Sequence, residues 1–438
     1  MLRALERRRA GKVSEVFRRS ADSQAAYDFL EHRAIAAETV QQVATEAVAK
    51  LCAEHDVVYV VLDGSSLTLT EREEGSKGFG SIGSHSNGAR GIKVLNALAL
   101  GPEGQTLGVI AQRFWVRTKP AKEGPRPLVE RESCRWHEAL QSARTRLSDC
   151  APETKRHVLA DREGDASLLM QRIVDDGDDF TIRANGHRNV VIDGQKVNVR
   201  DLLSQKVPIA RTTIPVPAKG GQPSRIAALA VRAARVQIVL RDHHTKKRRI
   251  LELTVVWGRE EATSPGAKRL DWMLYTTVPV KAAGDAVATL VRYSYRWRIE
   301  EYHRLLKRGG GRVEDTQLRS PQAVIKWATM HSIVAGRAQR LRDASRSAPD
   351  LPASTELTAD EIEALVFLKQ DEKRRNEIVS AEGLTLQRAV RWIADLGGFT
   401  ATGKSTKPPG STVIARGLER VLDAQQLIHF LRAAGKLR

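Results

Sequence analysis

The sequence predicts an α/β fold in which the core is interrupted by a β-rich insertion and flanked by helical N- and C-terminal regions. Three observations support this prediction. Two apolar, strand-like runs each lead to an aspartate, one ending at Asp63 and the other at Asp161. The interval 185–284 carries further strand signals separated by turn residues. Helical periodicity dominates both ends of the chain.

These changes of pattern suggest the domain organisation. The predicted segments are a helical N-terminal region at 1–55, the first part of the core at 56–184, a β insertion at 185–284, core helices at 285–345 and a helical C-terminal region at 355–438. A Ser/Pro-rich hinge at 347–354 precedes the last segment. In the first part of the core, residues 91–100 and 107–116 predict a β-hairpin, and a helix is expected from Glu132 to about Leu147.

The charge balance favours a polyanionic partner. The 438 residues include 71 Lys and Arg against 52 Asp and Glu, a formal net charge of +19. Nucleic acid fits this excess best, and scattered basic residues argue against the alternative of an anionic membrane surface. Three cysteines without metal-ligand spacing, and no apolar run of membrane length or signal peptide, lead us to expect a reduced, cytoplasmic protein that contacts no membrane.

One charged stretch, Tyr293–Lys307, predicts a continuous helix because no Gly or Pro occurs before Gly309. At about 100° per residue, one face of about 80° would carry a phenol, a carboxylate and several cations. These residues are Tyr293, Arg296, Glu300, Arg304 and Lys307. The opposite side carries Ile299, Tyr302 and Leu306, which predict core packing. The simplest interpretation is a solvated face with an ion pair between Glu300 and Arg304.

The spacing Tyr-x2-Arg-x3-Glu-x6-Lys favours a different interpretation. The run from Tyr293 to His303 resembles the signature of the insertion-sequence-four family of bacterial cut-and-paste DDE transposases. The segment Asp-Arg-Glu-Gly-Asp at 161–165 closely matches a second motif of that family, Asp-Arg-Glu-Ala-Asp. Residues 23–30 and Pro408-Pro409-Gly410 also resemble family elements, so the resemblance covers nearly everything after residue 20.

The resemblance implies a ribonuclease-H-like core in which Asp63, Asp161 and Glu300 form the catalytic triad. It also implies two Mg²⁺ ions, with Mn²⁺ as an alternative, that lie about 4 Å from each other and are held by these carboxylates. An aspartate after a strand is more often a turn residue or helix cap, and we expect Asp165 to cap a helix over 166–174. Gly64-Ser65-Ser66-Leu67 replaces the family's Thr-Thr-x-Leu.

The same resemblance implies residues that hold DNA. Phosphate contacts are expected from Arg183, Tyr293, Arg296, Arg304 and Lys307. Trp272 and Trp297 are expected to hold or wedge an extruded base. For Trp272, packing in a core strand is an equally good interpretation.

The implied activity is cut-and-paste transposition: nicking, excision through a hairpin, and strand transfer. The partners would be double-stranded transposon ends and target DNA, in the bacterial nucleoid. The synaptic complex would contain a homodimer whose two chains associate through the C-terminal region. Only about twenty residues precede the family's short helix, so we expect an abbreviated end-recognition region. Two alternatives remain: a nuclease of the same fold that cuts without inserting, and a non-transposing DNA-binding or inhibitory relative.

Overall fold

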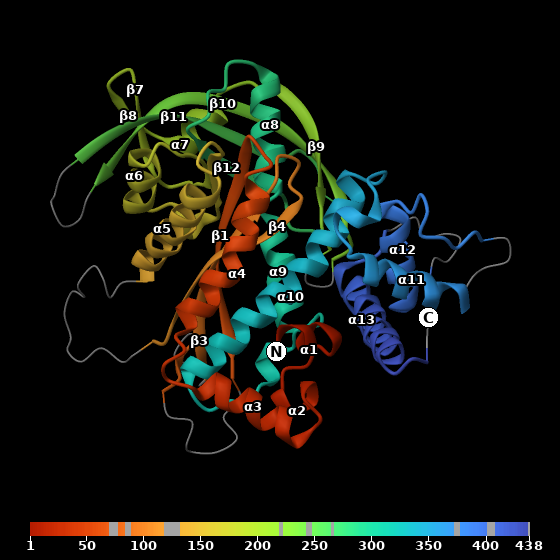
Figure 1. Ribbon diagram of the computed structural model, residues 1–438. Coiled ribbons are helices and arrows are strands. Elements are labelled where there is room, and N and C mark those ends of the chain that lie inside the picture. The colour runs from red at the N-terminus through yellow and green to blue at the C-terminus, as the bar shows by residue number, and fades with distance from the viewer. Residues whose placement is uncertain are drawn as a thin grey trace.

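In a computed structural model of the chain, the described residues form a twelve-stranded mixed sheet that is flanked by helices and followed by a helical C-terminal region (Figure 1). The structure describes residues 1–69, 78–83, 89–117, 132–218, 222–241, 248–263, 267–371, 377–400 and 408–436. The expected α/β class with helical termini is confirmed. Two further predictions from the sequence, a Lys/Pro/Gly-rich linker at 118–127 and a basic turn at 243–247, fall outside the described residues. The same holds for part of a Gly/Ser-rich loop predicted at 75–88.

The first part of the sheet is built around β1 (Val57–Thr68). This strand pairs antiparallel with β3 (Arg90–Leu100) and parallel with β5 (Lys155–Ala160). The outer strands are β2 (Gly80–Ser81) and β4 (Thr106–Trp115), both paired with β3, and β6 (Asp179–Arg183), paired parallel with β5. The predicted hairpin at 91–116 is confirmed as β3 and β4. Its β-branched and apolar composition suits strands that are buried on both faces.

The β-rich interval continues the same sheet. Its strands are β7 (Asn189–Ile192), β8 (Gln195–Asn198), β9 (Ala210–Val216), β10 (Arg225–Arg241), β11 (Arg248–Glu260) and β12 (Asp271–Thr276). β12 pairs antiparallel with both β6 and β11 and so joins the insertion to the core. Asp193 and Gly194 both have positive φ, as a two-residue type I′ hairpin turn requires, which confirms the turn expected there.

Helices cover the two faces of the core strands. Alternate residues of β1, such as Val60 and Val61, point to opposite apolar clusters. The first face packs against α4 (Ala37–Cys52), α5 (Glu132–Cys150), α6 (Ser167–Asp175) and α7 (Val199–Ser204). The second packs against α1 (Leu2–Arg7), α2 (Val13–Val16), α3 (Ser20–Glu31), α9 (Trp297–Lys307) and α10 (Pro321–Ser347). α8 (Ala283–Ser294) packs on the β insertion with its own cluster.

The C-terminal helices form a further core. α11 (Ala359–Asp371), α12 (Leu386–Leu396) and α13 (Ser411–Ala433) lie together on one side of the molecule (Figure 1). α12 and α13 approach so closely that a Cβ on Gly417 would lie 1.6 Å from the carbonyl oxygen of Ile393, so only glycine fits there. α10 connects the cores, because Trp327 belongs to one cluster and Leu341 to the other. The helix ends at Ser347, where the hinge was expected.

Three short 3₁₀ turns complete the described elements: η2 (Arg162–Gly164), η3 (Val313–Asp315) and η4 (Ala353–Thr355). Among the described helices, none combines the length and the apolar character needed to cross a bilayer.

The structure corrects three local predictions. β1 does not end at Asp63 but continues to Thr68, because β3 goes on pairing with it from Asn96 to Gly91. The stretch 293–307 is not one helix: α8 ends at Ser294 and α9 begins at Trp297. Asp165 does not cap α6, because its carboxylate pairs with Arg188 at 2.5 Å; Asp161 is the residue that caps a turn, η2.

Candidate active site

Asp63 and Asp161 lie side by side where the parallel β1–β5 ladder ends. The last paired residues of that ladder are Leu62 and Ala160, and the two aspartates are the next residues of their chains. Asp63 stays within β1, opposite Asn96 of β3. Asp161 leaves its strand and accepts a hydrogen bond from the Glu163 backbone N–H at 2.8 Å. Parallel pairing therefore brings together two carboxylates that are far apart in the sequence.

Glu300 reaches this region from α9 through a shared arginine. The Arg296 guanidinium lies 2.6 Å from Glu300 Oε1 and 3.6 Å from Asp63 Oδ2. Arg296 is only 8% exposed, so its positive charge is held among these carboxylates. Burial alone would lower the pKa of Arg296, but Tyr293, Asp63 and Glu300 outweigh it and raise that pKa. Arg296 thus neutralises part of the acidic group.

Burial, together with the remaining negative charge, changes the titration of Asp63. Burial, opposed by Arg296 and reinforced by Asp161 and Glu300, raises the pKa of Asp63 to about 7. A carboxylate surrounded in this way favours either a proton or an added cation. Its oxygen donors, with those of Asp161 and Glu300, are the hard ligands that Mg²⁺ prefers. As the side chains stand, however, no three His, Cys, Asp or Glu residues of the described parts of the chain are grouped closely enough to hold a metal ion.

The break between α8 and α9 buries Tyr293 between Trp272 and the charged group, because the Arg296 guanidinium carbon lies 6.0 Å from the centroid of the Tyr293 ring. Around residues 295–299 the backbone forms i to i−3 hydrogen bonds, such as Arg296 N–H to Tyr293 C=O at 3.1 Å. Tyr293 is 2% exposed, and its ring packs edge-to-face on Trp272 at 4.9 Å between centroids. Two other residues of the predicted charged face, Arg296 and Glu300, also lie together.

The two tryptophans proposed for base handling contact each other. The rings of Trp272 and Trp297 lie 5.0 Å apart, and Trp272 is 3% exposed within the α8 cluster. In this arrangement Trp272 packs in a strand of the core, which was one of its two interpretations. A role in holding an extruded base stays a prediction for both residues.

The expected phosphate-binding cations differ in exposure. Arg304 is exposed at the end of α9, and Lys307 is partly buried. Burial lowers the pKa of Lys307, with Asp63 and Glu314 opposing that effect, so Lys307 lies within electrostatic reach of the acidic group. Arg183, at the end of β6, donates to the Asp271 carbonyl at 2.8 Å, and Arg296 and Tyr293 affect its pKa, which burial lowers. Their contacts with DNA stay predictions.

Sequence reasoning missed His303, which is buried beside Asp63. Its Nδ1 lies 4.0 Å from Asp63 Oδ2, and its Nε2 lies 2.9 Å from the Asn96 amide nitrogen. Because an amide nitrogen only donates, Nε2 accepts and the ring proton is on Nδ1, facing Asp63. Burial lowers the pKa of His303 to about 3, so the ring is neutral. The signal was its place one helical turn after Glu300.

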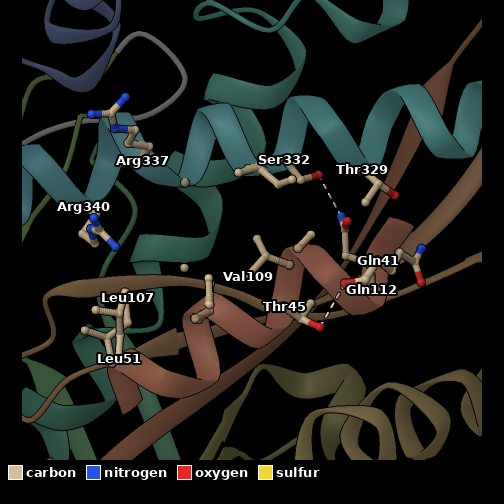
Figure 2. Close-up of a pocket in the computed structure, with 16 residues that line it drawn as sticks. Gln41, Thr45, Leu51, Leu107, Val109, Gln112, Thr329, Ser332, Arg337 and Arg340 are labelled. Carbon is tan, nitrogen blue, oxygen red and sulfur yellow. Dashed lines mark hydrogen bonds between the residues drawn. The ribbon is translucent and has the colours of Figure 1, made fainter. Parts of the chain in front are cut away.

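A buried amide relay fixes this histidine. Gln112 donates to Asn96 Oδ1 at 2.7 Å and to Ser332 Oγ at 3.0 Å. Gln112 also lines a largely apolar pocket between α4, β4 and α10, where Figure 2 shows its bond to Ser332. The relay therefore links the acidic group to the packing of α10 against the sheet.

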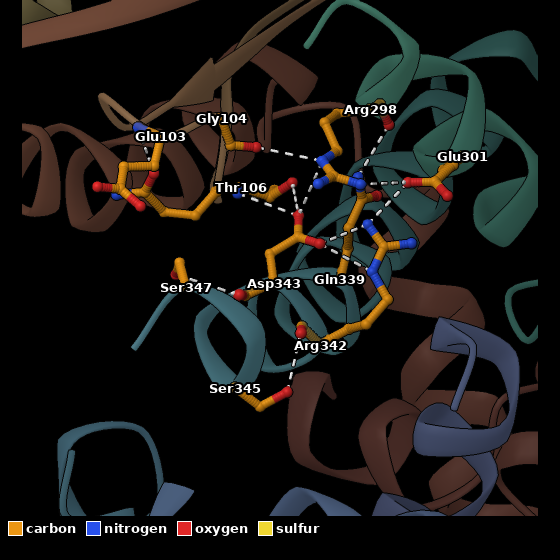
Figure 3. Close-up of polar contacts among 11 residues, drawn as sticks. Glu103, Gly104, Thr106, Arg298, Glu301, Gln339, Arg342, Asp343, Ser345 and Ser347 are labelled. Atoms are coloured by element: carbon orange, nitrogen blue, oxygen red, sulfur yellow. Dashed lines mark hydrogen bonds and ion pairs between the residues drawn. The ribbon is translucent and has the colours of Figure 1, made fainter. Parts of the chain in front are cut away.

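Glu301, next to the predicted catalytic glutamate, has a separate role. It pairs with Arg342 of α10 at 2.7 Å and with Arg298 at 3.3 Å (Figure 3). Asp343, 1% exposed, completes this cluster through Arg342, and it accepts two hydrogen bonds from Thr106 at the start of β4. These contacts fasten the first turn of α9 to α10 and to the β3–β4 hairpin.

No family model matches the chain.

Proposed function

We propose that the chain is a metal-dependent DDE polynucleotidyl transferase of the cut-and-paste transposase type, with a ribonuclease-H-like core. One observation carries the proposal: Asp63 and Asp161 follow the last rung of a parallel ladder, and Arg296 joins Glu300 to Asp63. The strand arrangement supports it, since an antiparallel hairpin lies on one side of β1 and two parallel strands lie on the other. The net charge of +19 supports a nucleic-acid substrate.

The roles of the residues follow from their positions. Asp63, Asp161 and Glu300 would hold the metal ions. Bound Mg²⁺ supplies a nucleophilic oxygen and neutralises charge on the leaving oxygen in phosphodiester chemistry. Arg296 already holds positive charge between two carboxylates, and a phosphate is an alternative partner for its guanidinium. His303, neutral and fixed by Asn96, orients the Asp63 carboxylate. Arg304 and Lys307 lie on the same helix as Glu300 and supply further phosphate contacts.

The test uses Asp161→Asn, because the asparagine keeps the oxygen that accepts the Glu163 N–H bond. Nicking of supercoiled plasmid in Mg²⁺ or Mn²⁺ should occur with the unmodified chain and be lost in this variant. Asp149→Asn, an exposed acidic residue on α5, is the matched control and should keep the activity. Nicking that is equal in both variants, or independent of metal, overturns the proposal.

A second measurement separates transposition from simple cleavage. Duplexes carrying the DNA that flanks the coding sequence are incubated with a target plasmid, and joined products are counted. Joining supports the transposase, whereas cleavage without joining identifies a nuclease of the same fold. Binding without cleavage identifies the non-transposing relative.

A further inference from the structure

A cluster of arginines surrounds a single tryptophan at the end of the β insertion. The guanidinium carbons of Arg200, Arg232 and Arg259 lie 5.4, 5.5 and 5.6 Å from the ring centroid of Trp257. Trp257 itself is 2% exposed, so these cations and the neighbouring strands cover the indole. Arg232 and Trp257 are register partners on β10 and β11, and Arg200 comes from α7.

The cluster has more positive than negative charge. Asp271 accepts from Trp257 Nε1 at 2.7 Å and pairs with Arg200 at 3.1 Å. Arg232 donates to the Lys206 carbonyl at 2.8 Å, which leaves its charge uncompensated. Arg259 is exposed and forms no hydrogen bond or ion pair with a residue in the described ranges. Among the described residues, three guanidinium groups are therefore balanced by one carboxylate, that of Asp271. The excess positive charge favours the binding of an anion.

Stacking on the indole suits these arginines for phosphate binding. A guanidinium held against an aromatic ring keeps its in-plane N–H donors available and loses little side-chain freedom when it binds an oxyanion. The same stacking fixes several donors at one end of the sheet. An arginine used only for packing needs no such excess of charge.

The sheet register places this cluster relative to the candidate active site. Asp161 follows Ala160, the register partner of Ile182, so Asp161 lies at the same height in the sheet as Arg183. Arg183 pairs with Leu274 of β12, and Leu274 pairs with Val256 of β11. Trp257 and Arg259 thus lie one and three residues beyond that level, at the same end of the sheet as Asp161. β5 and β11 are three strand spacings apart, or about 14 Å at about 4.8 Å each.

That separation matches a bound duplex. About 14 Å of duplex axis corresponds to four or five base pairs at about 3.4 Å each, with phosphates on both strands. The arginines project from the face of the sheet that carries α7, opposite to Trp272, so the duplex must cross the end of the sheet. The geometry points to Arg200, Arg232 and Arg259 as a second duplex-backbone contact, four or five base pairs from the phosphate at Asp161. This inference rests on the proposed function.

The salt dependence of duplex binding tests the inference. Affinity of the full chain for a fluorescent 30-base-pair duplex of arbitrary sequence is measured over a range of salt concentrations. Removing two phosphate contacts with Arg232→Ala plus Arg259→Ala should reduce the slope of log K against log salt by about 1.8, at about 0.9 per phosphate. The matched control is Arg211→Ala plus Arg235→Ala, exposed residues of the same sheet paired with Glu261 and Glu252, which should leave the slope unchanged.

The double variant Arg232→Lys plus Arg259→Lys keeps both charges and should have the full slope. A double alanine variant that lowers the melting temperature while keeping the full slope shows a packing role on Trp257 and overturns the inference. An unmodified chain that binds the duplex without salt dependence contradicts the proposed function itself, so the two failures are distinguishable.

Discussion

Two arginine–carboxylate clusters include residues of α9, and they differ in their balance of positive and negative charge. The cluster of Arg298, Glu301, Arg342 and Asp343 has equal numbers of positive and negative groups (Figure 3). The group around Arg296 contains three carboxylates, those of Asp63, Asp161 and Glu300. The Glu300 side chain is 29% exposed and the Asp63 side chain 17%. Adjacent glutamates thus serve opposite purposes. A charge-balanced cluster fixes a helix, whereas a cluster with excess acidic groups is left with negative charge that a cation can neutralise.

The largest expected effect is on the balanced cluster. Asp343→Asn keeps the acceptor for Thr106 but leaves Arg342 and Arg298 without a buried counter-charge, which should reduce the free energy of unfolding by about 3–5 kcal/mol. Chemical denaturation measures this. Glu363→Gln, which removes an exposed pair with Arg432, is the control and should cost less than about 1 kcal/mol. A cost for Asp343→Asn as small as that of the control would show that this cluster does not stabilise the fold.

The second prediction compares the effects of replacing each of the two adjacent glutamates, Glu300 and Glu301, with glutamine. Glu300→Gln should reduce metal-dependent cleavage by about 10²–10³-fold, because a preorganised charge at the reacting centre is lost. DNA binding and stability should stay close to those of the unmodified chain. Glu301→Gln should instead lower the melting temperature and keep cleavage at temperatures where it is folded. Single-turnover cleavage with thermal unfolding distinguishes them, and a loss of DNA binding equal to the loss of cleavage contradicts the assignment of Glu300.

The third prediction uses the raised pKa of Asp63, about 7 in the folded chain against about 3.9 when unfolded. Between these values the folded chain holds a proton that the unfolded chain has released. The free energy of unfolding should therefore fall as pH rises from about 4 to about 7. Asp63→Asn should flatten that dependence and stabilise the chain at pH 8 by a few kcal/mol, at about 1.36 kcal/mol per pKa unit. Urea denaturation at a series of pH values measures it, and an unchanged profile shows that the acidic group carries no excess charge.

The smallest expected effect concerns the histidine that sequence reasoning missed. His303→Gln should slow cleavage by about 10-fold, the lower end of the range for residues that orient a ligand carboxylate. The reason is that Asp63 loses its fixed neighbour while the metal donors remain. Single-turnover rates measure the change. A loss as large as that of Glu300→Gln would assign His303 a direct part in the chemistry.

Much of the fold was predictable because it depends on local pattern. Apolar runs before Asp63 and Asp161, and the turn at Asp193-Gly194, predicted strands and a hairpin that the structure contains. Periodicity also placed Ile299, Tyr302 and Leu306 in the core. These features follow from side-chain alternation and from the conformations that turn residues favour.

The sequence by itself determined the α/β class and the basic net charge, and it identified Asp63, Asp161 and Glu300 as the candidate site carboxylates. Only the tertiary structure decided that β1 continues past Asp63, since β3 supplies the hydrogen bonds, and that Tyr293 turns toward Trp272. It also decided which glutamate faces the acidic group and that His303 lies against Asp63. Such outcomes depend on partners distant in sequence, because burial and charge compensation are properties of the assembled core and not of any single segment.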